Sequence, residues 1–536
     1  MKTSKTAESV LRKRYLLKNN KGRIIETPEG MFKRAAGEIS KIDAKYGQDS
    51  KKSFKAFFEA MESLDFLPNS PTLMNAGTTM QQLSACFVVP IEDSMESIFG
   101  ALKSMALIHQ SGGGVGFSFS RLRPEGDIVK KSRGISSGPV SFMKIFDTAT
   151  EVIKQGGRRR GANMGVLNVN HPDILKFASA KKRGGFQNFN ISIGVSDKFM
   201  EAVKQNKIFG LANPSTGKIA EKASAKKIMD EIVENAWATG DPGMLFIDEI
   251  NRKHPLNEKV EATNPCGEQP LLPYESCNLG SINLSNMVSD KEIDWEKLRK
   301  TVRLGVHFLD NAIDLSQFPL PEIEKKTKSN RKIGLGVMGF AEMLIKLGIS
   351  YDSEKAAEKA EEIMKFITSE ARIKSQGLAR KRGSFPNFKK SKLASKYKEM
   401  RNATVTTIAP TGSISIIAGT SSGIEPLFAV KYTRQILGGK KFTEENSLWK
   451  SGKYDKKLFV TALQVKPQQH VKIQAAFQKH TDNAVSKTVN MPSTATKADV
   501  RKVFMLAYQM KCKGITVYRN KSKGEQVLSA CPECEV

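Results

Sequence analysis

A short stretch of the chain, residues 262–280 (ATNPCGEQPLLPYESCNLG), places an amide, a thiol and a carboxylate at alternate positions. Its prolines each remove a backbone donor and fix φ, which excludes a helix and favours an extended strand or loop. In an extended chain, side chains two positions apart lie on the same face. We therefore expect Asn264, Cys266 and Glu268 to point together into whatever this segment faces.

The chain has six cysteines among 536 residues, too few for a secreted disulfide scaffold. A single cysteine is most often a small buried hydrophobic residue, but the alternation with asparagine and glutamate favours chemistry at Cys266. The six histidines are scattered, and none forms a close group of the kind that holds zinc or iron. No metal site is predicted.

The elements that must position these residues change in character near residue 65. Before it, residues 31–47 and 53–67 carry apolar side chains at helical spacing. Beyond it, short apolar runs alternate with helical segments, which predicts an α/β fold, and closure into a barrel is one way to avoid open sheet edges. We expect a helical region at 1–65, a catalytic α/β barrel at 66–520 and a flexible tail at 521–536.

The sequence also limits location and partners. No stretch is apolar for the length of a membrane helix and the N-terminus lacks the core of a signal peptide, so we expect a cytoplasmic protein without membrane contact. The formal net charge of +30 favours nucleic acid, an anionic surface or phosphorylated small molecules as partners. Because the basic residues are spread along the chain, a general compositional bias explains the charge better, and charge alone identifies no partner.

Four stretches resemble one family: NSPTLMNAG with LSACFV, then SGGGVGFSFSRLRP, then NPCGEQPLL with ESCNLGSINL, and finally APTGSISIIAGTSSGIEP. In this order, and over roughly residues 10–528, the chain resembles the ribonucleotide reductases, specifically their adenosylcobalamin-dependent class. The resemblance implies a ten-stranded α/β barrel of two five-stranded halves around a central finger loop, preceded by a small helical region. It also implies reduction of ribonucleotides, more often diphosphates than triphosphates, to the 2′-deoxyribonucleotides needed for DNA synthesis.

The residues in the first stretch fit the chemistry that the resemblance implies. A thiyl radical at Cys266 takes the 3′-hydrogen of the ribose, and Glu268 accepts the proton of the 3′-hydroxyl group. Asn264 hydrogen-bonds the ribose. By resemblance, Cys86 and Cys277 form the dithiol that protonates the leaving 2′-hydroxyl group and ends as a disulfide.

The motif APTGSIS follows a strand-like run and precedes an apolar segment. Free backbone amides at a helix start, with the hydroxyls of Thr411 and Ser413, make an anion site for a substrate diphosphate. Standing alone, the motif would be read as an ordinary turn. The resemblance implies substrate contacts from Ser70, Ala85, Gly114, Pro410, Thr411, Gly412, Ser413 and Ile414.

The family also regulates substrate choice through a nucleoside triphosphate effector (ATP or a deoxynucleotide). The positions that match this effector site are Asp93 and Arg123, together with Arg159 in the loop at 155–165. A solvated basic turn is the other reading of that loop.

Two observations select the radical source. Relatives that depend on a separate di-iron subunit carry adjacent tyrosines near the C-terminus, whereas here Tyr518 is followed by Arg519. The glycyl-radical class usually lacks the equivalent of Glu268 and carries a C-terminal glycyl loop, which we do not find. Adenosylcobalamin remains by exclusion, with no separate radical-generating subunit, although no cobalamin signature is present.

Two alternatives stay open for the function as a whole. One is the same reaction with a different radical source. The other is a nucleic-acid-binding relative that has kept the fold but lost turnover, against which the intact set of catalytic residues argues. The sequence leaves monomer and homodimer equally open.

The tail carries Cys531 and Cys534 as a Cys-x-x-Cys pair. Such a pair can exchange with the Cys86–Cys277 disulfide and then be reduced by a thioredoxin-like partner. Membership of a four-cysteine zinc site is the alternative.

A literal G-x-G-x-x-G is formed by Gly334, Gly336 and Gly339. The residues before it do not predict a strand, so the dinucleotide-binding motif lacks its context. We expect these glycines to permit close packing of a helix.

Overall fold

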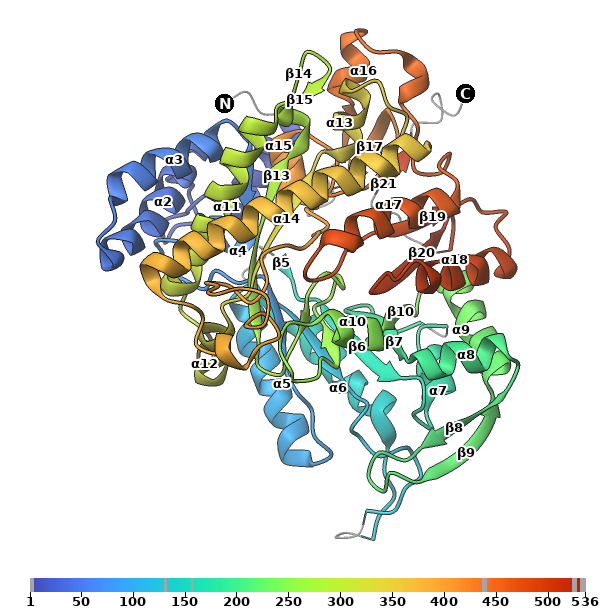
Figure 1. The fold of residues 1–536 in the computed structure, drawn as a ribbon. Helices are drawn as coiled ribbons and strands as arrows, with labels where there is room; N and C mark the ends of the chain where they lie inside the picture. The colour runs from blue at the N-terminus through green and yellow to red at the C-terminus, as the bar shows by residue number, and fades with distance from the viewer. Residues whose placement is uncertain are drawn as a thin grey trace.

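The computed structural model describes residues 4–129, 133–155, 159–182, 184–435, 441–522 and 528–530. No helix in these ranges is both long and apolar enough to cross a membrane. The first part of the chain is helical and lies beside α11 at one side of the molecule (Figure 1). Its elements are α1 (Lys5–Val10), a π-helical turn (Leu11–Tyr15), α2 (Pro28–Ser40) and α3 (Ser50–Glu62).

Local sequence explains where these helices begin. The side chain of Thr27 accepts a hydrogen bond from the backbone of Gly30, and Pro28 takes the first helical position of α2. Asp49 caps α3 through the backbone N–H groups of Lys51 and Lys52. The buried faces of both helices pack into a core shared with α11 (Trp295–Leu315).

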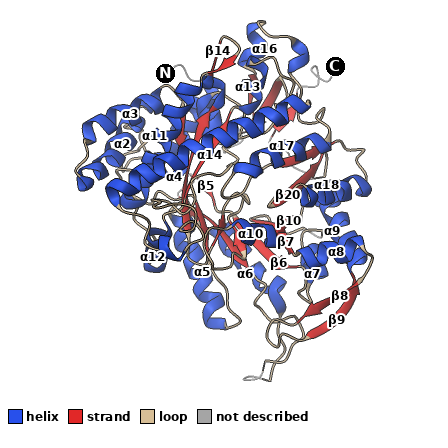
Figure 2. Cartoon of the chain, viewed as in Figure 1, coloured by secondary structure: helices blue, strands red, loops and turns tan. Residues whose placement is uncertain are grey.

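The centre of the molecule is a ten-stranded sheet (Figure 2). Its strands are β1 (Phe66–Pro68), β2 (Cys86–Val88), β3 (Gly114–Ser118), β6 (Asn163–Asn168), β7 (Phe189–Val195), β10 (Gly243–Phe246), β13 (Ser276–Asn283), β16 (Ile333–Met338), β19 (Thr488–Met491) and β20 (Gly514–Arg519). The order is β1-β13-β2-β3-β6-β7-β10-β20-β19, with β16 paired to β13.

Apart from β1, which pairs antiparallel with β13, the sheet consists of two parallel halves that meet in antiparallel pairs. Strands β2, β3, β6, β7 and β10 run parallel to one another, and so do β13 with β16 and β19 with β20. The halves join where β2 pairs with β13 and where β10 pairs with β20. Single parallel bridges from residues 404–408 to Leu335 and to Val485 close the second half. The predicted α/β barrel of two halves is confirmed.

Helices cover the outside of the barrel. α5 (Met95–Gln110), α6 (Gly138–Val152) and α9 (Ala225–Thr239) pack on the first half. The long helix α14 (Glu354–Arg382) crosses the second half and packs on α11 and α17 (Pro467–His480), as Figure 1 shows in gold and red. α18 (Lys497–Gln509) begins with a capping box formed by Thr496 and Asp499.

A finger loop passes against the inner face of β3. It is held at its base by β11 (Ala262–Thr263) and β12 (Pro270–Leu271), which pair antiparallel. A Cβ atom on Gly116 would lie 1.7 Å from the carbonyl oxygen of Thr263, and one on Gly114 would lie 2.9 Å from Cγ of Pro265. Glycines in β3 therefore let the finger approach closely enough to reach the centre of the barrel.

Gly334 and Gly336 lie in β16 and Gly339 follows it as the N-cap of α13 (Phe340–Lys346), and the atoms nearest to these glycines belong to strands and loops, so the expectation of helix packing was wrong. A Cβ atom on Gly336 would lie 2.3 Å from the carbonyl oxygen of Thr407. The close neighbour is therefore the strand-like segment 404–408, which the barrel needs for closure.

A buried carboxylate holds three arginines together behind the second half. Asp310 on α11 is fully buried, and its Oδ1 accepts from Nη2 of Arg331 at 2.8 Å. Its Oδ2 accepts from Nη1 of Arg382 at 3.0 Å and from Nε of Arg401 at 3.2 Å. Burial alone would raise the pKa of Asp310, but the charges of the three arginines outweigh it and hold that pKa well below its ordinary value.

We expect Asp310→Ala to lower the free energy of unfolding by about 3–5 kcal/mol, because it leaves buried guanidinium groups without their counter-charge. A carboxylate with a depressed folded-state pKa stabilises the protein above the pKa of the unfolded chain, and this contribution is lost as the pH falls below about 5. The loss caused by the substitution is therefore largest at neutral pH and shrinks in acid. Urea unfolding at pH 7 and at about pH 3 measures both effects. Glu296→Ala, an exposed carboxylate on the same helix, serves as the control, and an unchanged midpoint for Asp310→Ala would contradict the prediction.

Candidate active site

A cavity of about 300 Å³ lies between the tip of the finger, the ends of several strands and the segment 409–414. It gathers segments that are far apart in the chain. Every residue that the sequence predicted for the ribose and the phosphate lines it, except Cys277. These residues are Ser70, Ala85, Cys86, Gly114, Asn264, Cys266, Glu268, Pro410, Thr411, Gly412, Ser413 and Ile414.

The finger tip is a tight turn, so the premise of an extended chain at 264–268 was wrong. The N–H of Gly267 donates to the carbonyl oxygen of Asn264 at 3.1 Å, and Gly267 has a φ of +81°. The N–H of Gln269 donates to Oδ1 of Asn264 at 2.9 Å. The turn nevertheless brings Asn264, Cys266 and Glu268 to one cavity, with the Cys266 side exposed and the other two buried.

Cys86 lies at the centre of the polar contacts. Nδ2 of Asn264 donates to Sγ of Cys86 at 3.0 Å, and Sγ of Cys86 lies 3.9 Å from Oε1 of Glu268. Asn264 and Glu268 are each only 2% exposed. An amide, a thiol and a carboxylate therefore meet in a site that excludes most water, where proton transfer between them and a bound sugar is favoured.

Cys277 stands directly opposite Cys86 in the antiparallel pair of β13 and β2. Residues opposite each other in such a pair have Cα atoms about 4.5–5.5 Å apart, within the range that a disulfide requires. Cys277 is completely buried behind Cys86 and does not line the cavity. Burial raises the pKa of the Cys277 thiol well above its ordinary value.

The segment 410–414 forms the other end of the cavity and leads into α15 (Ile414–Ala418). Thr411 adopts a left-handed conformation with a φ of +52°, and its Oγ1 accepts from the N–H of Gly423 at 2.7 Å. This contact fixes the segment at the start of α15, where the N–H of Ser415 donates to the carbonyl oxygen of Thr411 at 2.9 Å and Ile414 lines the cavity. The start of a helix favours an anion.

The structure adds two residues that sequence reasoning missed. Nη1 of Arg14 donates to Oγ of Ser413 at 3.2 Å, and the hydroxyl of Tyr15 lies 2.7 Å from Oγ of Ser70. Both line the cavity and come from the π-helical turn at the start of the chain. Arg14 therefore brings a positive charge to the segment predicted to bind phosphate.

A second cavity, of about 730 Å³, lies on the other side of the finger tip. Its wall is formed by β7, β10 and β20 and by the residues before β19, and it includes Ser192, Met244, Gln474, Thr516 and Tyr518. Pro265 and Cys266 belong to the linings of both cavities. The thiol of Cys266 therefore stands between two spaces.

Asp93 and Arg123, two of the three residues predicted for the effector, lie outside both cavities. Nε of Arg123 donates to Oδ2 of Asp93 at 2.8 Å, and each side chain is about one-quarter exposed. Oγ of Ser215 also donates to Asp93, at 3.1 Å. Arg159 lies in β5 (Arg159–Arg160), but its side chain is outside the described part of the structure, as are Cys531 and Cys534.

Among the residues that the structure describes, no group of three or more His, Cys, Asp or Glu side chains is placed to hold a metal ion.

Comparison with known proteins agrees with this geometry. The chain matches the family model of the ribonucleotide reductase barrel domain over residues 84–518, and that of the ribonucleotide reductase all-alpha domain over residues 1–81. It is 48% identical to the vitamin B12-dependent ribonucleoside-diphosphate reductase of Thermoplasma acidophilum, over 99% of this chain and 80% of the relative. It is 46% identical to the enzyme of the same name from Mycobacterium tuberculosis, over 99% of this chain and 81% of the relative. A fold of two parallel half-barrels, a finger that carries Cys266 and these matches along nearly the whole chain lead to one conclusion: the chain belongs to the ribonucleotide reductase family.

Proposed function

We propose that this chain reduces ribonucleoside diphosphates to 2′-deoxyribonucleoside diphosphates, with adenosylcobalamin as the radical source and a cysteine pair as the reductant. The observation that carries the proposal is the meeting of Cys266, Asn264, Glu268 and Cys86 around one small cavity. The names of the relatives supply the diphosphate substrate and the dependence on vitamin B12.

Each residue has a distinct part in the proposed reaction. Cys266, as a thiyl radical, takes the 3′-hydrogen, while Glu268 accepts the 3′-hydroxyl proton and Asn264 orients the sugar. The bond between C2′ and its oxygen then breaks, and Cys86 gives the proton with which the hydroxyl group leaves as water. Cys86 and Cys277 together supply two electrons and the hydrogen that C2′ gains, and they become a disulfide. Glu268 returns its proton to the 3′-oxygen, and Cys266 returns a hydrogen atom to C3′.

The diphosphate is proposed to bind at the opposite end of the cavity. The N–H of Ile414 and the hydroxyl of Ser413 provide donors there, and Arg14 provides a positive charge next to Ser413. This arrangement leaves the sugar over the finger tip, because the same cavity contains both groups.

Bound adenosylcobalamin supplies the radical by homolysis of its cobalt–carbon bond. The second cavity fits this cofactor because it reaches Cys266 from the side away from the substrate and its wall mixes apolar and polar side chains. Ser192, Met244, Gln474, Thr516 and Tyr518 are the residues that would hold it.

The proposed effector site lies at residues outside the two cavities. We place the nucleoside triphosphate effector at the Asp93–Arg123 pair, where a partly exposed cation and hydroxyl donors favour a phosphate-bearing ligand. Arg159 is proposed to join it from the neighbouring loop. No separate radical-generating subunit is proposed.

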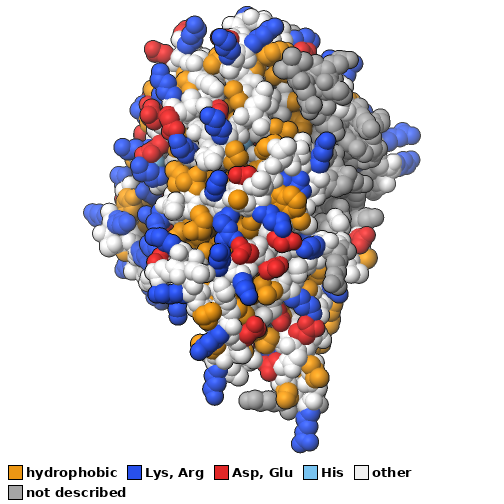
Figure 3. Space-filling model, turned by 90° about the vertical axis from the view of Figure 1, so that its right-hand side faces the viewer, with side chains coloured by type: hydrophobic (Ala, Val, Ile, Leu, Met, Phe, Trp, Pro, Cys, Tyr) orange, Lys and Arg blue, Asp and Glu red, His pale blue; other side chains and the backbone are white. Residues whose placement is uncertain are grey.

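A nucleic-acid-binding protein without turnover is the alternative function. On the face drawn in Figure 3, Lys and Arg side chains are interspersed with Asp and Glu and with apolar side chains, and they form no single continuous stripe there. That distribution favours the enzyme over a nucleic-acid interface on this face.

Anaerobic turnover tests the proposal directly. Protein stripped of nucleic acid is mixed with adenosylcobalamin, dithiothreitol and either a ribonucleoside diphosphate or the matching triphosphate. We expect deoxyribonucleotide from the diphosphate without any second subunit. Absence of product with both substrates, together with tight retention of DNA, would favour the alternative. Product from the triphosphate alone would correct the substrate class.

The tail pair gives a separate prediction. Cys531→Ser with Cys534→Ser is expected to leave turnover with dithiothreitol unchanged, because a small dithiol reaches the cavity by itself. Turnover with thioredoxin as the only reductant should fall more than about tenfold, because thioredoxin cannot enter the cavity and needs the tail to carry electrons. Steady-state rates with the two reductants measure this, and equal rates for wild type and variant with thioredoxin would remove the proposed shuttle.

A further inference from the structure

A buried cluster of three ionisable side chains lies behind Cys277 and has no part in the chemistry proposed so far. Nζ of Lys332 donates to Oε2 of Glu275 at 2.6 Å and to Nε2 of His254 at 2.8 Å. Lys332 and Glu275 are completely buried, and His254 is 5% exposed. Charges buried this deeply are costly to the fold unless their partners satisfy them, so their position next to a redox pair calls for an explanation.

The cluster adjoins the sulfur of Cys277 through two strands. In the parallel pair of β13 and β16, Asn278 lies opposite Ile333. Cys277 and Lys332 each precede one of these two residues, so they are neighbours across the pair. Sγ of Cys277 lies 3.5 Å from the carbonyl oxygen of Lys332. Burial raises the pKa of Cys277. The charge of Lys332 acts against that rise, as a nearby cation does for a thiolate, whereas the charges of Glu275 and Glu268 add to it.

The hydrogen bonds determine which group holds protons. Nδ1 of His254 lies 3.1 Å from the carbonyl oxygen of Leu256. A carbonyl oxygen only accepts, so Nδ1 carries the proton and Nε2 accepts from the ammonium group of Lys332. Burial, followed by the charge of Lys332, lowers the pKa of His254 well below its ordinary value, so the imidazole is neutral.

The carboxylate of Glu275 accepts two further hydrogen bonds besides the one from Lys332. Nδ2 of Asn330 donates to its Oε1 at 2.6 Å, and the N–H of Leu272 donates to its Oε2 at 2.8 Å. An ammonium group has three N–H bonds, and Glu275 and His254 take two of those of Lys332. Within the described residues the third N–H has no hydrogen-bond acceptor, so it remains for a group that gains negative charge.

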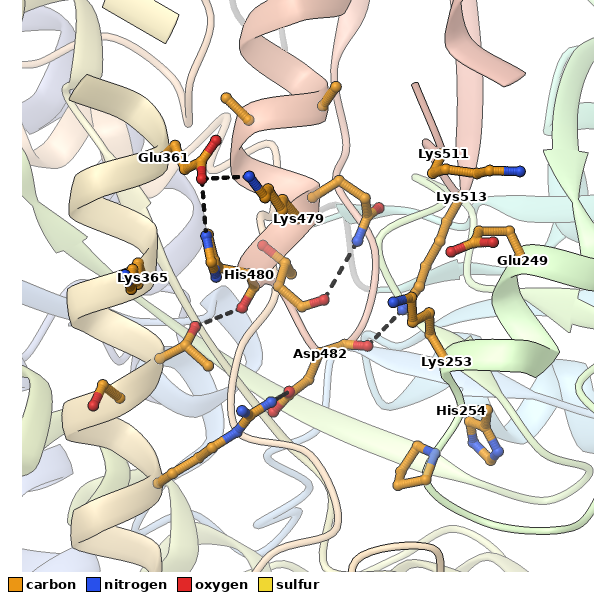
Figure 4. A pocket seen from close by; sticks show the side chains of 18 of the residues that line it. Glu249, Lys253, His254, Glu361, Lys365, Lys479, His480, Asp482, Lys511 and Lys513 are labelled. Atoms are coloured by element: carbon orange, nitrogen blue, oxygen red, sulfur yellow. Dashed lines mark hydrogen bonds and ion pairs between the residues drawn. The ribbon is translucent and has the colours of Figure 1, made fainter. Parts of the chain in front are cut away.

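The cluster reaches solvent on the side away from the substrate. His254, which follows α10 (Ile247–Lys253), lines a cavity of about 1160 Å³ between α14, α17 and the segment 392–403. Figure 4 shows His254 on the wall of this cavity, below Lys253 and Lys513. The described lining of this cavity shares no residue with that of the substrate cavity.

We propose that Lys332, positioned by Glu275 and His254, gives Cys277 its proton when the Cys86–Cys277 disulfide is reduced after each turnover. The inference rests on the proposed function, because it requires that Cys86 and Cys277 form that disulfide.

The exposure of the two sulfurs sets the direction of the exchange. Cys86 lines the substrate cavity and Cys277 does not, so a thiolate of the incoming dithiol attacks Sγ of Cys86. The disulfide bond breaks, its electron pair goes to Sγ of Cys277, and Lys332 donates a proton to it. The second thiolate of the dithiol then attacks the mixed disulfide and releases Cys86, and the dithiol leaves as a disulfide. Lys332 does not line the large cavity, so it regains its proton from solvent by way of His254, which does.

Separate measurement of the first turnover and of the re-reduction tests this inference. Reduced protein is given substrate and adenosylcobalamin without reductant, and the amount of product reports the first turnover. Dithiothreitol is then added, and alkylation at timed intervals with peptide mass analysis gives the rate at which the Cys86–Cys277 disulfide opens.

Lys332→Met is expected to keep the first-turnover product but to slow the opening of the disulfide by about 100-fold, the scale of general acid catalysis. Because this variant leaves Glu275 charged and alone, Lys332→Met with Glu275→Leu is tested beside it; replacement of both members of a buried ion pair by apolar groups is often tolerated. Lys346→Met, which removes a half-buried lysine bonded to a carbonyl oxygen elsewhere, is the control and should open its disulfide at the wild-type rate.

The outcomes separate the two proposals. Slow opening in the double variant with a normal first turnover supports the role of Lys332. Opening at the wild-type rate in that variant would overturn it while leaving the proposed function intact. A wild-type protein that makes product without forming a Cys86–Cys277 disulfide would overturn the cysteine pair, and this inference with it.

Discussion

Replacement of Cys266 by serine is expected to lower ribonucleotide reduction by at least about a thousandfold, to background, while nucleotide binding is kept. The hydroxyl of serine holds its hydrogen too strongly to exchange it with a carbon of the sugar, so no radical can pass to the substrate. The turn at 264–267 depends on backbone hydrogen bonds and on Gly267. The substitution should therefore leave the shape of the cavity unchanged.

Anaerobic turnover and equilibrium dialysis with labelled nucleotide check the two halves of this prediction. Cys512→Ala is the matched control, because Cys512 is fully buried and lies outside the two cavities at the finger tip. It should cost some stability without abolishing turnover. Measurable reduction by the Cys266→Ser variant would refute the role of the sulfur.

Glu268→Gln is expected to lower kcat by about 10²–10⁴-fold, the contribution of a well-placed general base. Glutamine has nearly the same size as glutamate, so it fills the same buried space beside Cys86 but cannot accept the 3′-hydroxyl proton. The loss should therefore fall on kcat, with little change in nucleotide affinity.

Steady-state kinetics with the diphosphate substrate measure that split. Glu261→Gln is the control, because Glu261 stands at the base of the same finger, where Oε1 pairs with Nη2 of Arg121 at 2.9 Å outside the substrate cavity. A wild-type kcat in Glu268→Gln would show that another group takes the proton.

Short motifs predicted the barrel and most of the cavity lining because each motif forms a single turn or strand whose geometry depends on neighbouring residues in the sequence. The run that contains Pro410 to Ile414 is one turn before a helix, and Asn264 to Glu268 is one turn of a finger. The mistake at the finger was in the backbone: Gly267 has a positive φ, and one such residue converts an extended chain into a turn without a change in which residues meet.

The residues that were missed depend on contacts between distant segments. Arg14 meets Ser413 across almost 400 positions (399), and no spacing in the sequence reports such a contact. Lys332, Glu275 and His254 come from three separate segments and contact one another only in the fold. In the sequence, each of them alone would be predicted to be an ordinary surface residue. Their meeting follows only from the register of β13 with β16 and from the end of α10.

The placement of Cys266 in the walls of two cavities has a thermodynamic consequence. Two ligands that occupy those spaces touch the same small piece of backbone, Pro265 and Cys266, and the described linings share no other residue. A ligand that displaces Pro265 or Cys266 in one cavity therefore changes the wall of the other, which couples the two binding free energies through these two residues.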